Sequence, residues 1–202
     1  MHLMPERVGG RLCLDFVNTV DPRDVGPSKE YLPDYGAVLD WFASADVALP
    51  RAISWLADTA QQQPAAAVRA HARLVEMREA LFVVISESIN TSEVRATDLD
   101  TVNLALGESI GHRVLAPSAR GGVREEWRVS DSLEQVLWPI AIDAWDLLTE
   151  PELLRVRACP VESGGCGWLF LDTSRSGNRR WCDMRTCGNR AKVRAHYSRK
   201  AG

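Results

Sequence analysis

CPVESGGCGWLFLDTSRSGNRRWCDMRTC, residues 159–187, is the most informative segment of this chain. Its four cysteines are separated by six, fifteen and four residues: Cys159, Cys166, Cys182 and Cys187. Zinc prefers four tetrahedral ligands, and four thiolates make a closed, structural site without an open position for water or substrate. Four ordinary buried thiols are the alternative, but this spacing in a basic context favours a metal. We therefore predict one structural Zn²⁺ held by these cysteines.

The residues around the cysteines predict a small fold. Residues 168–171 alternate between two faces, residues 174–178 can turn, and residues 179–182 return, which predicts a hairpin. Gly164 and Gly165 absorb the wide spacing of the first cysteine pair. Residues 188–199 lack proline and predict a helix that begins at the last cysteine. Together these elements predict a treble-clef-like finger, and so short a tail benefits from a metal because its own core is small.

Charge divides the 202-residue chain at the same place. Residues 151–202 carry 11 Lys and Arg against 4 Asp and Glu, whereas residues 1–150 carry 13 against 23. The net charge of −3 therefore hides a basic tail and an acidic body. This division predicts two units with different partners, 1–150 and 151–202.

The basic residues of the tail indicate a phosphate-bearing partner. Arginine outnumbers lysine there, and its planar guanidinium suits bidentate contacts with phosphate and guanine. A basic surface that is only solvated is the alternative. At 100° per residue the terminal helix has no single basic face. The candidate nucleic-acid-binding residues are Arg175, Arg179, Arg180, Arg190, Lys192, Arg194 and Arg199.

Residues 1–150 predict a mostly helical domain with one hairpin, so the expected class is mainly α, with a small α+β component. Apolar residues recur at helical spacing in four segments. These segments are Tyr35–Asp46, Pro50–Gln61, Ala65–Ile89 and Thr97–Ile110. Pro50 is expected in the first turn of its helix, and Thr97 is expected to cap its helix. The pattern of residues 11–20 fits a short helix or a strand, and residues 22–33 predict a loop.

The remainder of this domain predicts a hairpin and one further helix. Residues 112–116 and 125–129 form the hairpin around a turn at residues 119–122. Residues 130–149 predict a helix that bends at Pro139. Three tryptophans of this region are expected in the core: Trp127, Trp138 and Trp145.

The acidic domain contains no recognisable catalytic constellation. It has no nucleophile elbow, no glycine-rich phosphate loop and no histidine pair at metal spacing, so we do not expect an enzyme. Asp15, Asn18, Thr19 and Arg78 are the first candidates for a small-molecule effector pocket, although such residues more commonly cap nearby backbone. Cys13 is expected to be a small buried apolar residue.

The sequence shows no secretory signal and no apolar run long enough to span a bilayer. We therefore expect a cytoplasmic protein that does not enter a membrane.

Three motifs of the tail occur in order: CGWLFLD at residues 166–172, RRWC at 179–182 and CGNRAK at 187–192. They resemble the CGNR zinc finger family. Upstream, LCLDFVNT at residues 12–19 and the helix around residues 74–82 are similar to the ABATE domain. The resemblance implies a bacterial stress-induced transcription regulator with the finger as its DNA-binding part, and it assigns the four cysteines as ligands. The first cysteine pair is spaced more widely than the family leads us to expect.

These observations lead to one main hypothesis and two alternatives. The main hypothesis is a DNA-binding transcription regulator whose acidic domain senses an effector or forms a homodimer. One alternative is a zinc-stabilised module that docks an acidic protein. The other is RNA binding by the same finger, with Trp168, Phe170 or Trp181 as stacking platforms.

Overall fold

The computed structural model of the protein describes residues 4–23, 28–45, 47, 49 and 51–201. Within these ranges the chain is mostly helical, and its β structure consists of three two-stranded antiparallel sheets. The predicted class, mainly α with small hairpins, is therefore confirmed.

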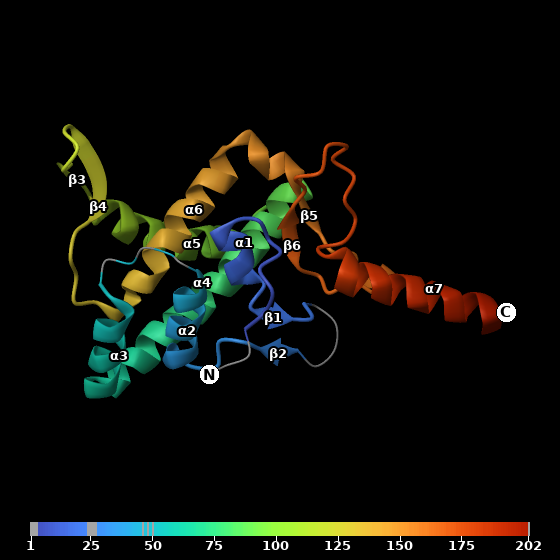
Figure 1. Ribbon diagram of the computed structural model, residues 1–202, viewed down its shortest axis with the longest axis horizontal. Helices are drawn as coiled ribbons and strands as arrows, with labels where there is room; N and C mark the ends of the chain where they lie inside the picture. Colours follow the sequence, from blue (N-terminus) through green and yellow to red (C-terminus); the bar gives the residue numbers. More distant parts are fainter. Residues whose placement is uncertain (1–3, 24–27, 46, 48, 50, 202) are drawn as a thin grey trace.

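The helices of the N-terminal part pack around one long central helix (Figure 1). The elements are α1 (Leu12–Val17), α2 (Tyr35–Ala45), α3 (Ile53–Gln62), α4 (Pro64–Ile89), α5 (Ala96–Gly111) and α6 (Trp138–Thr149). Helix α4 contacts α1, α2, α3 and α5. The four helices predicted from periodicity are confirmed within a few residues, whereas Pro50 lies outside the described residues.

The core is built on the apolar side of α4. Leu74, Met77, Leu81 and Ile85 are at most 1% exposed and pack in a single cluster with residues of α1, α2 and α6. Full burial of each such side chain stabilises the fold by roughly 1.5–3 kcal/mol. Two details differ from prediction. Val68, an apolar residue of the periodic segment 65–89, is largely exposed on α4. Helix α5 begins after Arg95, which leaves Thr97 inside the helix instead of capping it.

The segment 11–20, which fitted two structures, forms α1 and then a strand. All but two of the α1 side chains are buried, including Cys13, so the expectation of a buried thiol is confirmed. Strand β1 (Val20–Asp21) pairs with β2 (Lys29–Glu30), with Val20 opposite Glu30. The predicted loop at 22–33 therefore contains one short strand.

The hairpin and the helix that follow it differ in detail from prediction. Strands β3 (Arg113–Pro117) and β4 (Val123–Trp127) pair as predicted. The expected bent helix is instead a 3₁₀ turn, η1 (Leu133–Leu137), followed by α6. Pro139 falls in the first turn of α6, where its missing N–H removes no helical hydrogen bond.

The three tryptophans expected in the core differ in burial. Trp138 is buried, and Trp127 packs against it with ring centres 5.9 Å apart. Trp145 is 50% exposed on α6, so its assignment to the core is wrong.

The tail is a series of short elements followed by one long helix. They are η2 (Pro151–Arg155), β5 (Val156–Ala158), η3 (Val161–Ser163), β6 (Leu169–Leu171), the π-helical turn η4 (Met184–Gly188) and α7 (Asn189–Ala201). Strand β6 pairs with β5, with Arg157 opposite Phe170, and not with residues 179–182. The hairpin predicted for the finger is therefore wrong in its partner strand.

Strand β6 is a wall shared by two clusters. Because successive strand residues face opposite sides, Leu169 and Leu171 enter the main helical core, while Trp168 and Phe170 pack around the four cysteines. Val156 of β5 also belongs to the main core. The division at residue 151 stays a prediction, and the core is continuous across it.

Candidate metal centre

The four cysteines meet in one compact cluster. Their Sγ atoms all lie within 4.8 Å of one another, and each cysteine is at most 3% exposed. The Sγ atom of Cys182 lies 3.5 Å from that of Cys166 and 3.7 Å from that of Cys187. Tetrahedral zinc with bonds of about 2.3 Å requires sulfur–sulfur distances of about 3.8 Å. The arrangement therefore fits one structural zinc ion, as predicted.

Neighbouring thiols shift one another's pKa in this cluster. Hydrogen bonds from Cys166 and the other thiols lower the pKa of Cys159, whereas a hydrogen bond with Cys159 raises the pKa of Cys182. The pKa of Cys187 is lowered and that of Cys166 is raised, so some thiolates are favoured at the expense of others. A dication removes this competition because it stabilises all four thiolates at once.

Two glycines make the wide first pair possible. Gly164 has φ of +90°, and the N–H of Gly165 donates to the carbonyl of Pro160 at 2.8 Å. A Cβ on Gly165 would lie 2.7 Å from the Sγ of Cys159. The six-residue spacing is therefore closed by a compact turn that only glycine fits, which confirms the role expected for this pair.

The second cysteine pair is held by one predicted nucleic-acid-binding residue and by a helix cap. Arg179 was a candidate for nucleic-acid binding, but its guanidinium donates to the carbonyls of Trp181 and Cys182 and stacks 4.8 Å from the Phe170 ring. Asp183 accepts a hydrogen bond of 2.7 Å from the N–H of Arg185 and so caps η4. Arg179 therefore braces the backbone at a predicted ligand.

Asp172 is a structural residue that the sequence analysis missed. It is fully buried, and its carboxylate accepts hydrogen bonds from the N–H groups of Ser174 at 2.9 Å and Arg179 at 2.8 Å. Hydrogen bonding by Ser174 and Arg179 lowers its pKa. These bonds close the loop 173–178, in place of the predicted strand at 179–182. An Asp directly after an apolar strand and two residues before Ser174 is the local signal of such a turn.

The N-terminal segment is hydrogen-bonded to the finger. The side-chain amide of Asn18 pairs with Leu169, accepting from its N–H at 2.9 Å and donating to its carbonyl at 2.8 Å. The indole N–H of Trp168 donates to Val20, and the N–H of Arg23 donates to Cys166, at 2.7 and 2.8 Å. The finger is thus built against residues 9–23.

The four candidates for an effector pocket each have a hydrogen-bond partner within the protein. Asn18 binds Leu169, and Asp15 accepts from the N–H of Gly9 at 2.8 Å. Thr19 donates to the carbonyl of Phe16. Arg78 is buried, and its guanidinium binds both oxygens of Glu30 at 2.7 Å. These contacts are structural and give the predicted pocket no support.

The remaining basic candidates differ in exposure. Arg175, Arg190 and Lys192 are exposed. Arg180 is exposed too, but it contacts Ser163 and stacks 5.0 Å from the Trp181 ring. Arg194 is exposed and packs beside Gly164. The side chain of Arg199 lies outside the described part of α7.

The stacking platforms proposed for RNA are covered. Trp168 is 7% exposed and Phe170 is fully buried, because both side chains face the cysteine cluster. Trp181 is half-buried against the same cluster. The stacking that motivated the RNA alternative is therefore not available at Trp168 or Phe170.

No helix in the described ranges is long and apolar enough to span a membrane.

Comparison with known families matches almost the whole chain. Residues 10–151 match the ABATE family model, described as "Putative stress-induced transcription regulator". Residues 155–200 match the model of the CGNR zinc finger. Neither description is that of an enzyme. No curated protein is similar enough to this chain to count as a match.

Proposed function

Because the chain belongs to the ABATE family of stress-induced transcription regulators and ends in a CGNR zinc finger, we propose that it binds DNA through that finger. The zinc cluster is closed and buried, so it serves as a scaffold. The contacts with DNA come from the exposed basic residues around it, and chiefly from α7.

The placement of α7 carries this proposal. The helix begins at Asn189, two residues after Cys187, and extends away from the rest of the molecule (Figure 1). Its 13 residues span about 20 Å, and the major groove of DNA is wide enough to admit a helix. Arg190, Lys192 and Arg194 are exposed on it, as are the apolar Val193 and Tyr197.

The acidic body supports the same reading by exclusion. Residues 1–150 carry an excess of ten negative charges, which repels a phosphate backbone. We therefore assign contact with DNA to the tail, and either effector sensing or homodimerisation to the body. A dimer would present two fingers and read two half-sites.

The test is the salt dependence of binding by the intact, zinc-loaded chain to random duplex DNA. The logarithm of the binding constant falls against the logarithm of salt by about 0.9 for each phosphate contact. Replacing Arg190 or Lys192 by Ala is expected to reduce the slope by about one each and to weaken binding to all sequences.

The control is Arg120→Ala, an exposed residue in the turn between β3 and β4, far from α7 (Figure 1). It should leave the slope unchanged. If the chain ignores DNA at low salt but binds an acidic protein, the interaction-module alternative replaces this proposal.

A further inference from the structure

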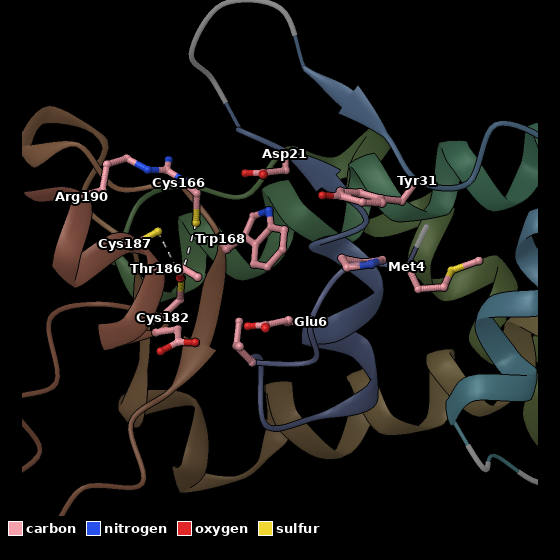
Figure 2. Close-up of a pocket in the computed structure, with 13 residues that line it drawn as sticks. Met4, Glu6, Asp21, Tyr31, Cys166, Trp168, Cys182, Thr186, Cys187 and Arg190 are labelled. Atoms are coloured by element: carbon pink, nitrogen blue, oxygen red, sulfur yellow. Dashed lines mark hydrogen bonds between the residues drawn. The ribbon is translucent and has the colours of Figure 1, made fainter. Parts of the chain in front are cut away.

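A cavity of about 230 Å³ lies where the N-terminal segment, β1, β2 and the zinc cluster meet (Figure 2). Its apolar wall includes Met4, Val8, Tyr31 and Trp168. Figure 2 shows Tyr31 and Met4 on one side of Trp168 and the cysteines on the other. It is smaller than the ~300–1,000 Å³ typical of sites for drug-sized ligands, so it suits a small molecule.

The charged residues that line this cavity are mainly acidic. Glu6, Asp21 and Asp183 contribute three carboxylates, and Arg190 is the one basic residue in the lining. The cysteine cluster adds further negative charge, because four thiolates around Zn²⁺ leave a net −2. The field inside the cavity therefore favours a cation.

One carboxylate oxygen in the lining has no hydrogen-bond partner. Oδ2 of Asp183 is buried and accepts no hydrogen bond, whereas Oδ1 accepts from the N–H of Arg185. The guanidinium Nε of Arg185 lies 3.6 Å from Oδ2, beyond hydrogen-bonding distance, on a side chain that is 84% exposed. A buried acceptor without a hydrogen bond is unfavourable, so a donor supplied by a ligand would stabilise this oxygen.

The aromatic wall also suits a cation. Lys29 Nζ already lies 4.4 Å from the centre of the Tyr31 ring, so this ring attracts positive charge in its present setting. Aromatic faces attract ammonium ions, most strongly where water is excluded. Burial raises the pKa of Asp21, while Arg190 and Lys29 oppose the rise, which indicates that this carboxylate is partly desolvated.

We propose that this cavity binds a small organic ammonium ion, with its apolar body against Tyr31 and Trp168 and its charged nitrogen among the carboxylates of Glu6, Asp21 and Asp183. An anionic ligand would be repelled by three carboxylates and attracted by a single arginine. A neutral ligand would not neutralise the negative charge of the site. A role of this ammonium ion as an effector of DNA binding would rest on the proposed function. Binding itself does not.

The experiment uses the intact, zinc-loaded chain and three probes of matched shape: 2-phenylethylamine, 2-phenylethanol and 3-phenylpropanoate. Binding is followed by ligand-observed NMR and calorimetry. The amine is expected to bind at least tenfold more tightly than the alcohol, and the carboxylate more weakly than both. Equal binding of the three probes, or no binding of the amine, overturns the proposal.

Single substitutions then test whether the amine binds in this cavity. Asp21→Asn and Glu6→Gln are each expected to weaken amine binding about tenfold, which corresponds to ~1.4 kcal/mol. Val8→Phe should block the cavity while keeping its charge, and Glu93→Gln, an exposed carboxylate between α4 and α5, should have no effect.

Amine binding that survives both Asp21→Asn and Glu6→Gln would also overturn the proposal. Zinc content is measured for every variant, and exposed Glu6 provides a substitution that leaves the packing intact. Because no DNA is present, failure here is distinct from failure of DNA binding.

Discussion

At the scale of single residues, the finger depends on groups that are not its ligands. Asp172 closes the loop after β6, Arg179 braces the carbonyl of Cys182, and Gly165 lies against the Sγ of Cys159. Replacement of groups that orient metal ligands typically weakens metal affinity by about 10–100-fold. The clearest tests at this scale therefore change residues beside the zinc cluster.

Replacing Asp172 by Ala is expected to lower the free energy of unfolding by about 1–3 kcal/mol, because two partly buried N–H groups lose their charged acceptor. The same variant should weaken zinc binding by roughly 10–100-fold. Chemical denaturation and competition with a chelator measure the two effects. An Asp172→Ala chain with unchanged zinc affinity would refute the structural role given to this carboxylate.

Two glycine substitutions form a matched pair. Gly165→Ala places a Cβ 2.7 Å from Cys159 Sγ, so zinc affinity should fall. Gly107→Ala lies inside α5 with nothing within 4 Å of the new Cβ, so it should stabilise the chain by about 0.5–1 kcal/mol. Chelator competition and thermal unfolding are the measurements, and equal behaviour of the two variants would contradict the tight first pair.

At the scale of elements, an ionic network joins α4 to β2 and to the residues that follow β1. Arg78 binds Glu30 and Glu79, and Glu79 also pairs with Arg23. Both arginines are buried, while the two carboxylates are partly exposed. Arg23 in turn donates its N–H to Cys166, so the network joins the longest helix to the zinc cluster.

This network has a predictable pH dependence. Burial alone would raise the pKa of Glu79, but Arg23 and Arg78 outweigh burial and lower it. A carboxylate whose pKa is lower in the folded state stabilises the fold above its unfolded pKa of about 4.3. This contribution is lost as the pH falls through the folded pKa. Glu79→Gln should therefore cost about 1 kcal/mol near neutral pH, a modest figure because the group is half-exposed.

The difference between wild type and Glu79→Gln should shrink as the pH falls below about 4. Denaturation at a series of pH values measures it, and comparison of the two chains removes the contribution of zinc loss in acid, which both share. Glu93→Gln is the control and should follow wild type throughout. A difference that does not depend on pH would rule out the ionic origin.

At the scale of the whole molecule, the finger and the helical body form one packed structure. Leu169 and Leu171 of β6 and Val156 of β5 belong to the main core, while the other face of β6 covers the cysteines. The chain therefore differs from a rigid domain joined by a linker to an independent finger. Helix α7 extends clear of the rest (Figure 1).

Removal of zinc is consequently expected to destabilise the helical body as well as the tail. A ligand such as zinc that binds only the folded state stabilises the whole unit that unfolds cooperatively. Chelation should lower the midpoint of a single thermal transition followed by helix circular dichroism, and hydrogen exchange in α1 should accelerate. Two transitions, with the helical one insensitive to chelator, would show that the units unfold separately.

Local sequence information was sufficient for much of this protein. The four long helices follow from apolar periodicity, and the metal cluster follows from the spacing of four cysteines, because helical faces and metal ligands depend on short separations along the chain. The exposed positions of Arg175 and Lys192 are likewise ordinary for charged residues. Errors arose where a residue had partners far away in sequence.

Those distant partners were decided by the tertiary structure alone. Strand β6 pairs with β5 because Asp172 satisfies the loop that was expected to return as a strand, and Arg179 turns inward to the carbonyls near Cys182. Asn18 pairs with Leu169, and Arg78 pairs with Thr19 and Glu30. The cavity beside Tyr31 and Trp168 exists only because packing brings the start of the chain against its last fifty residues. Burial and hydrogen bonding between segments that are distant in sequence select one packing arrangement among several that the local sequence pattern allows equally well.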